Sequence, residues 1–272
     1  FAATPRIQNI QALVHAAAAI ELIHEASIVH DDIQDKTNRR RGLPTVWRKF
    51  GADAALLLGD HLVAAAFRSI AEAPDIDDIK GTLIVALSES VSRAASGQHL
   101  QLTNQTCSDV EAFYVNVAVN KTGALLALPL QFASLFNRQD ATGALAARRC
   151  GEQLGLAYQI LDDLKPYAMP SKLADDEDMQ NRVITAPVAA CSMLFPHVDP
   201  FQTLIKKTDM RDKATLECQR WLDTAVANAR YETTFLDQAV ARVVEQFIGQ
   251  RLSQKLALTV NAVPRYSEYS PR

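Results

Sequence analysis

The chain has 272 residues, of which 48% are hydrophobic and 22% are charged, a composition that suits a globular protein and excludes a disordered polyelectrolyte. The net charge of −3 at pH 7 argues against a nucleic-acid-binding protein that relies on a positive field. Four cysteines without metal-site spacing predict reduced thiols, and we expect a cytoplasmic protein. The longest near-apolar stretch, residues 123–136, is too short to cross a bilayer, so we expect no stable membrane insertion.

Apolar residues recur with helical periodicity along almost the whole chain, and no segment alternates with the period of a strand. The sequence therefore predicts a single all-α domain over residues 1–272, with about ten helices around one core and an irregular tail over residues 259–272. The expected helices, in chain order, cover residues 10–34, 52–73, 77–103, 109–120, 123–136, 141–165, 183–194, 203–207, 212–229 and 234–258. We expect a basic loop at residues 36–44 and a mobile polar loop at residues 168–180.

Three aspartates close the first expected helix. Asp31 and Asp35 are four residues apart and project from one helix face, with Asp32 beside them. Carboxylates at this spacing repel one another, and a hard divalent cation such as Mg²⁺ would relieve the repulsion. A solvated acidic helix end is the alternative, but these residues terminate a deeply apolar helix, and this position favours a metal site.

An arginine run follows within a few residues. Arg40 and Arg41 precede Gly42, and guanidinium groups present planar donors that match phosphate oxygens. A diphosphate is the natural ligand for carboxylates with Mg²⁺ on one side and guanidinium on the other. The alternative is an ordinary solvated basic loop.

A second pair of acids, Asp162 and Asp163, ends another long apolar helix, with Pro166 where a third acid would complete the pattern. Lys121 and Thr122, at an expected interruption between helices, offer an ammonium and a hydroxyl for phosphate. Each signal is weak alone, and Lys121 is equally suited to a helix-end cation that interacts with the dipole.

Six motifs in this order resemble the trans-isoprenyl diphosphate synthases, or polyprenyl synthetases, over residues 18–190. The matching motifs are Asp31-Asp32-Ile33-Gln34-Asp35, Arg40-Arg41-Gly42-Leu43-Pro44-Thr45, Phe50-Gly51 with Gly59-Asp60, Gly97-Gln98, Lys121-Thr122-Gly123, and Tyr158-Gln159-Ile160-Leu161-Asp162-Asp163. The resemblance implies a helical fold of the isoprenoid synthase type I around a central cavity. It also implies a homodimeric prenyltransferase that condenses isopentenyl diphosphate with an allylic diphosphate.

The same resemblance implies residue roles, with about three Mg²⁺ ions in each active site. Magnesium would be held by Asp31, Asp32, Asp35, Asp162 and Asp163. The diphosphates would be bound by Arg40, Arg41, Gln98, Lys121 and Arg182, and Thr122 and Gln159 would line the site of the carbocation. The residues expected to carry catalysis are Asp31, Asp32, Asp35, Lys121, Thr122 and Gln159.

The floor of the product pocket in this family lies four and five residues before the first aspartate. Ser27 and Ala26 occupy these positions, and Ile23 lies one helical turn deeper. Small side chains would not block a growing prenyl chain, so the resemblance implies a product of about C20 or longer, unless another helix closes the tunnel.

Three places matter for the comparison with the family. The GKRxRP segment that binds isopentenyl diphosphate in this family lies further before Asp31 than the given sequence reaches, so its presence stays open; Pro166 stands where a third acid would, and Arg182 stands where the family usually has lysine. Two alternatives therefore stay open. The first is a terpene synthase, or a prenyltransferase with another acceptor, on the same fold. The second is a non-catalytic regulatory subunit of an active partner.

Overall fold

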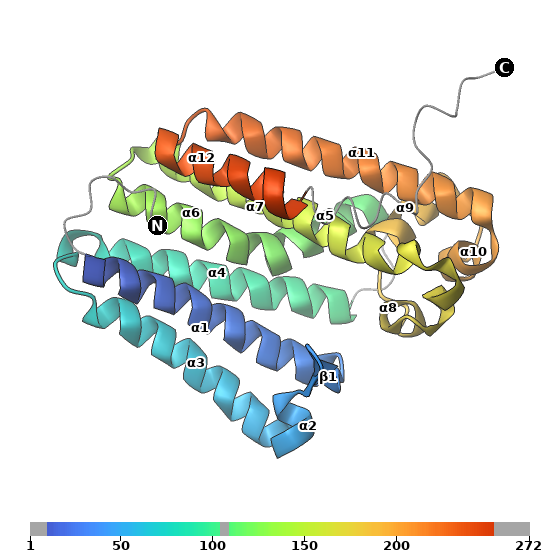
Figure 1. Cartoon of the computed structure of the whole chain (residues 1–272), viewed down its shortest axis with the longest axis horizontal. Helices are drawn as coiled ribbons and strands as arrows, with labels where there is room; N and C mark the ends of the chain where they lie inside the picture. The colour runs from blue at the N-terminus through green and yellow to red at the C-terminus, as the bar shows by residue number, and fades with distance from the viewer. Residues whose placement is uncertain (1–9, 104–108, 253–272) are drawn as a thin grey trace.

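The structure is a computed structural model, and it describes residues 10–103 and 109–252. Within these residues the chain forms twelve α-helices, four short 3₁₀ or π segments and one two-stranded hairpin. The long helices lie side by side along the long axis of the molecule (Figure 1). The predicted all-α fold is confirmed. The expected tail over 259–272 lies outside the described residues, and the single-domain boundary stays a prediction.

The first three long helices match the sequence expectation closely. They are α1 (Ile10–Gln34), α3 (Ala52–Glu72) and α4 (Asp77–Thr103). Helix α3 ends before Pro74 because the residue that precedes a proline is restricted to extended conformations, and Ala73 has φ −63° and ψ 128°. Helix α4 begins with two acids that interact favourably with the helix dipole.

The expected basic loop at residues 36–44 is instead partly a hairpin of β1 (Arg39–Arg40) and β2 (Leu43–Pro44), followed by the short helix α2 (Val46–Phe50). The turn residues Arg41 and Gly42 both have positive φ, 51° and 83°, as a type I′ hairpin turn requires. Strands of two residues carry no periodicity, so the sequence pattern could not predict them.

The middle of the chain is one helical stretch. It comprises α5 (Val110–Ala118), the π-helix η1 (Val119–Gly123) and α6 (Ala124–Phe136). Asp109 caps α5 through its side chain, which accepts a hydrogen bond from the Ala112 N–H. The expected interruption at Lys121 is a single wide turn rather than a break, because π-turns insert one extra residue into a continuing helix.

The C-terminal half surrounds the second pair of acids. Its elements are α7 (Ala141–Leu164), η2 (Lys165–Ala168), η3 (Pro170–Asp175), α8 (Glu177–Gln180), α9 (Ala186–Leu194), α10 (Pro200–Lys206), α11 (Thr208–Thr233), α12 (Gln238–Phe247) and η4 (Ile248–Leu252). Residues 168–180 are not the expected irregular loop, and their expected mobility stays a prediction. Short helical turns form there because Tyr167, Leu173 and Met179 are buried in the core.

Two clusters of buried apolar side chains hold the helices together. One joins α1, α3, α4 and α6 through residues such as Ile70, Leu83 and Phe132. The other joins α5, α7 and the helices that follow through residues such as Ile160 and Leu204. The C-terminal ends of α1, α4 and α7 lie at the same end of the molecule, close to α8 (Figure 1).

Among the described residues, α1 and α3 are long and apolar enough to cross a membrane by length and composition alone. The core helices of proteins that never enter a membrane pass the same test. The expectation of no stable membrane insertion therefore stays a prediction.

Candidate active site

Asp31 and Asp32 of the first aspartate cluster lie in the last turn of α1, and Asp35 directly follows the helix. Asp32 is buried, with 5% of its surface exposed, whereas Asp35 is exposed at the helix end. Partial burial raises the pKa of Asp31, and the nearby charge of Lys121 opposes this effect. Carboxylates that are partly or fully buried, such as Asp31 and Asp32, are unfavourable unless cations lie close to them.

The basic hairpin supplies one of these cations. The Arg40 guanidinium donates to Asp32 through Nη2 at 2.7 Å and Nε at 3.1 Å, and this pairing raises the pKa of Arg40. The hairpin is tied to the end of α1 because Thr45 Oγ1 and Trp47 Nε1 both donate to the Thr37 carbonyl, at 2.7 and 2.8 Å. Arg40 thus lies next to the cluster, and its contact with a diphosphate stays a prediction.

Lys121 brings the second cation from the π-helix η1. Its Nζ donates to Gln101 Oε1 at 3.0 Å and lies 3.8 Å from Asp31 Oδ2. Glycines allow this close approach of η1 to its neighbours. A Cβ at Gly97 would lie 2.4 Å from the Lys121 backbone nitrogen, and one at Gly155 would lie 2.3 Å from the Cα of Gly123. Larger residues at these two positions would displace the turn that orients Lys121.

The next residue of η1 connects this turn to the second pair of acids. Thr122 Oγ1 donates to Gln159 Oε1 at 2.7 Å, and Gln159 Nε2 donates to Asp163 Oδ1 at 2.8 Å. The Ala186 N–H fixes the other oxygen of Asp163 at 2.8 Å. Burial raises the pKa of Asp163 to about 7, against the lowering effect of these hydrogen bonds.

The two acids of the second pair point to different surroundings. Asp163 is buried, whereas Asp162 is about one-third exposed and forms an ion pair with Lys165, at 2.6 Å between Oδ1 and Nζ. Pro166, in the following 3₁₀ turn, contributes no ligand atom from its side chain. The second pair therefore offers less free carboxylate than the first cluster.

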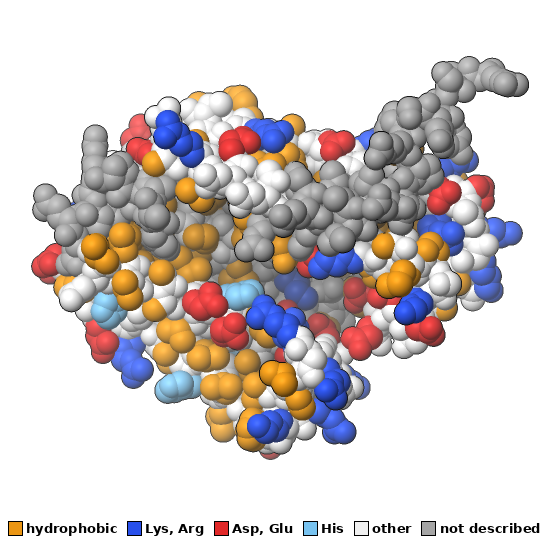
Figure 2. Space-filling view, viewed as in Figure 1, with side chains coloured by type: hydrophobic (Ala, Val, Ile, Leu, Met, Phe, Trp, Pro, Cys, Tyr) orange, Lys and Arg blue, Asp and Glu red, His pale blue; other side chains and the backbone are white. Residues whose placement is uncertain are grey.

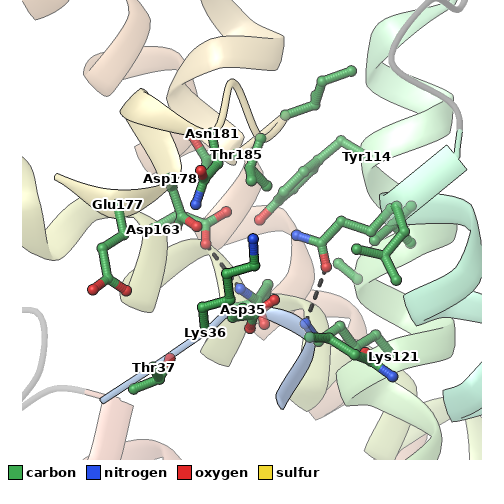
Figure 3. Close-up of a pocket in the computed structure, with 18 residues that line it drawn as sticks. Asp35, Lys36, Thr37, Tyr114, Lys121, Asp163, Glu177, Asp178, Asn181 and Thr185 are labelled. Atoms are coloured by element: carbon green, nitrogen blue, oxygen red, sulfur yellow. Dashed lines mark hydrogen bonds between the residues drawn. The ribbon is translucent and has the colours of Figure 1, made fainter. Parts of the chain in front are cut away.

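Both acidic segments contribute to one cavity of about 380 Å³ (Figure 3). Asp35 lines it from the end of α1, Asp163 from α7 and Lys121 from η1. The other lining residues are Gln34, Lys36, Thr37, Gln101, Leu102, Tyr114, Val117, Ala118, Gln159, Glu177, Asp178, Asn181, Val183, Ile184 and Thr185. Carboxylates from two helices that are far apart in sequence thus face a common space.

Sequence reasoning missed Asp178, which lines the cavity from α8. The residue is exposed, but protein around its carboxyl group raises its pKa to about 6, and Asp176 and Asp35 add to this effect. Its signal in the sequence is the run of four acids at residues 175–178, which reads as a solvated loop. Only the turns that bury Leu173 and Met179 bring this run to the cavity.

Other predicted residues lie elsewhere. Arg182 does not line the cavity, and its guanidinium instead lies 3.4 Å from both Asp199 oxygens and over the Phe201 ring. The structure thus gives no support to a substrate contact by Arg182. Gln98 is buried, and its amide has no hydrogen-bond partner among the described residues. Arg41 is exposed at the hairpin turn.

The predicted chain-length residues lie on α1, before the acidic cluster. Ile23 and Ala26 are buried, and Ile23 belongs to the apolar cluster that includes Leu128 and Phe132 of α6. Ser27 is half-buried, and its hydroxyl donates to the His24 carbonyl at 2.7 Å. Their effect on product length stays a prediction.

The donor set fits a Mg²⁺ ion whose remaining coordination positions are filled by a bound ligand. Within the described residues, no three His, Cys, Asp or Glu side chains converge as a ready-made metal site. Asp31 and Asp32 are instead drawn toward Lys121 and Arg40. Mg²⁺ commonly binds through one or two carboxylates plus phosphate oxygens, and the carboxylates here provide only oxygen donors. These features define a helical protein with an acidic cavity suited to a metal–phosphate ligand.

Comparison with known proteins agrees with this description. The family model described as polyprenyl synthetase matches residues 2–222, and the chain belongs to this family. The prenyl transferase of Cyanophora paradoxa is 34% identical over 176 residues, which cover 63% of this chain and 53% of that protein. The geranylgeranyl diphosphate synthase of Saccharolobus solfataricus is 34% identical over 154 residues, which cover 55% of this chain and 46% of that protein. The chain thus spans about half the length of these curated relatives.

Solved structures share the fold. A geranylgeranyl pyrophosphate synthetase from Geoglobus acetivorans superposes with a TM-score of 0.74 at 22% identity, covering 94% of this chain and 82% of that chain. A polyprenyl synthase from Caulobacter crescentus CB15, solved with calcium and isoprenyl diphosphate, superposes with a TM-score of 0.72 at 23% identity. The match covers 93% of this chain and 80% of that chain. At these identities the likeness establishes the architecture alone.

Proposed function

We propose that the chain is a Mg²⁺-dependent prenyltransferase that condenses isopentenyl diphosphate with an allylic diphosphate to give a polyprenyl diphosphate of about C20 or longer. The observation that carries the proposal is the shared cavity, which is lined by Asp35 from the end of α1, by Asp163 from α7 and by Lys121 from η1. Membership of the polyprenyl synthetase family supports the reaction class. Relatives named geranylgeranyl and solanesyl diphosphate synthase support a long product.

In this proposal the first step breaks the C–O bond of the allylic diphosphate, and the electron pair leaves with the diphosphate. Bound Mg²⁺ would supply charge neutralisation of the leaving group, held by Asp31, Asp32 and Asp35, with Asp162 and Asp163 on the opposite side. Lys121 lies 3.8 Å from Asp31, where its ammonium can also contact the departing phosphate.

The remaining steps join the two substrates. The alkene of isopentenyl diphosphate attacks the allylic cation to form the new C–C bond, and transfer of a proton to the released diphosphate restores a double bond. The Thr122 hydroxyl and the Gln159 amide are held by their mutual hydrogen bond at 2.7 Å. Fixed dipoles of this kind stabilise a cation without capturing it, and the apolar residues Val117 and Ala118 limit access of water.

The direct test is chromatography of the dephosphorylated product made from radiolabelled isopentenyl diphosphate and geranyl or farnesyl diphosphate. We expect Mg²⁺-dependent labelled prenols of about C20 or longer, and no product with a chelator. Consumption of the allylic diphosphate without incorporation of label would contradict chain elongation.

The altered second acidic pair favours one alternative, a terpene synthase or a prenyltransferase with another acceptor. Lys165 already neutralises Asp162, and Arg182 faces Asp199, so fewer groups are available for a second diphosphate. The same chromatography separates the alternatives. A cyclised or hydrolysed product without label would favour this second function. Product formation only after a partner synthase is added would favour a regulatory subunit.

We propose that the chain acts as a homodimer. Apolar side chains gather over α1 and α3 on the face shown in Figure 2. Leu56, Leu57 and Leu58 of α3 are 51%, 68% and 36% exposed, and large exposed apolar surfaces mark association sites. Sedimentation should give twice the mass of the chain, and Leu57→Asp should yield monomers.

A cytoplasmic location is likewise proposed, on the basis of the cysteine content alone.

A further inference from the structure

Helix α1 ends in a conformation that normally favours glycine. The Thr37 N–H donates to the Asp32 carbonyl at 3.0 Å and the Lys36 N–H donates to the Ile33 carbonyl at 3.4 Å, which together form a Schellman motif. Lys36 occupies the left-handed position of this motif, with φ 55°. A residue with a Cβ is strained in this region of backbone space, so the side chain of Lys36 needs an explanation.

The left-handed conformation alone does not single out Lys36. Arg138 ends α6 with φ 55° and the same pair of hydrogen bonds, from Gln139 N–H to the Ser134 carbonyl and from Arg138 N–H to the Leu135 carbonyl. Arg138, however, forms an ion pair with the exposed Asp78 and does not line the cavity. It is therefore a natural reference for Lys36.

The side chain of Lys36 lines the cavity and points into it (Figure 3). Its ammonium forms no ion pair or hydrogen bond with any residue in the part of the chain that the structure describes. Four other basic groups near the acidic segments are engaged. The pairs are Arg40 with Asp32, Lys121 with Gln101 and Asp31, Lys165 with Asp162, and Arg182 with Asp199.

A second polar group on the cavity wall also lacks a partner. Thr185 is 93% buried, its residue surface being 7% exposed, and its hydroxyl makes no hydrogen bond to the described residues. Thr185 comes from the segment before α9, on the side of the cavity that Asp163 and Asp178 also line. An unengaged ammonium and an unengaged hydroxyl in one acidic cavity are suited to an anion that arrives with its own metal ions.

We propose that Lys36 binds a phosphate oxygen of the substrate diphosphate inside this cavity, which Lys121 also lines. Lys36 thereby provides positive charge to the cavity, which Arg182 does not line. The assignment rests on the proposed function, because it takes the ligand to be a diphosphate.

The test is titration calorimetry of the full chain with inorganic pyrophosphate in the presence of Mg²⁺, together with thermal unfolding without ligand. Lys36→Gly should bind pyrophosphate about tenfold more weakly or worse, because a charge-assisted hydrogen bond is lost. The same variant should unfold at an equal or higher temperature, since glycine removes the left-handed strain. Lys36→Arg should retain affinity to within about threefold.

Arg138→Gly is the matched control, because it removes a cation from the same helix-ending position outside the cavity. It should leave pyrophosphate affinity unchanged. Two results would overturn the assignment of Lys36: equal pyrophosphate affinity of Lys36→Gly and the wild type, or equal losses of affinity in Lys36→Gly and Arg138→Gly. If labelled prenyl product is still formed, the proposed function stands and only this assignment fails. A wild type that binds no pyrophosphate with Mg²⁺ and forms no prenyl product would overturn the proposed function and this assignment together.

Discussion

The two acidic segments differ in how they are neutralised. In the first, Asp31 and Asp32 are paired with Lys121 and Arg40, which come from other parts of the chain. In the second, Asp162 is paired with Lys165 from its own helix end, and Asp163 is buried with an elevated pKa. The first segment is thus prepared to exchange its cations for a metal–diphosphate, whereas the second is partly occupied by its own lysine. Substitutions in each segment should therefore have unequal effects.

The largest effect is expected at the first segment. Asp31→Asn should lower prenyl turnover by roughly 100-fold or more, because the carboxylate nearest Lys121 no longer holds the metal that stabilises the leaving group. Unfolding temperature should stay the same or rise, since burial already penalises the charged form of Asp31. Steady-state kinetics and calorimetry check both parts, and a variant that unfolds while wild-type turnover is metal-independent would make the cluster structural.

The next effect is a pH dependence that belongs to the second segment. Asp163 has a folded-state pKa of about 7, above its ordinary value of 3.8, so the folded state holds its proton more tightly than the unfolded state. Its contribution to stability is complete below the unfolded pKa and is lost as pH rises through about 7. Metal-free protein should therefore melt several degrees lower at pH 8 than at pH 5.

Asp163→Asn removes this titration, and its melting temperature should change less over the same pH range. Calorimetric scans of both proteins at matched ionic strength make the measurement. An equally steep pH dependence in the variant would show that other groups cause it.

A substitution of Asp178 tests whether α8 contributes a carboxylate to metal binding. In the presence of pyrophosphate, Asp178→Asn should weaken Mn²⁺ binding by about tenfold, because one carboxylate of the cavity wall is lost. Asp175→Asn is the control, since this neighbouring acid is exposed and does not line the cavity. Electron paramagnetic resonance of free Mn²⁺ measures both, and equal affinities in the two variants would remove Asp178 from the site.

The smallest effect is expected at Lys165. Lys165→Met frees Asp162 from an ion pair in which the lysine is 54% exposed, so Mn²⁺ affinity should rise by only about two- to threefold. A fall in Mn²⁺ affinity would mean that the lysine supports metal binding instead of competing with it, and the contrast between the two segments would be lost.

The helices and the first segment could be predicted from sequence, because their signals are local. The bounds of α1 follow from its apolar run and its acidic end, and the bounds of α4 follow from Asp77 and Thr103. The hairpin could not be predicted, since it depends on hydrogen bonds from Thr45 and Trp47 to the Thr37 carbonyl. These contacts join residues whose proximity no periodic pattern encodes.

The second side of the cavity was less predictable for a related reason. The acids at residues 175–178 carry no helical pattern, and burial of Leu173 and Met179 decides where Asp178 lies. Arg182 has the residue type expected of a phosphate ligand, yet a positive φ of 55° and the contact with Phe201 accompany a side chain that lies outside the cavity. Residue type sets what a side chain can bind, whereas backbone conformation sets where it reaches.

The most direct measurement is anomalous diffraction from crystals grown with Mn²⁺ and inorganic pyrophosphate. Manganese should lie at Asp31 and Asp35 on one side and at Asp163 on the other, all bridged by a single diphosphate inside the cavity. Manganese bound at either acidic segment without a shared diphosphate, or a diphosphate located outside this cavity, would contradict the account.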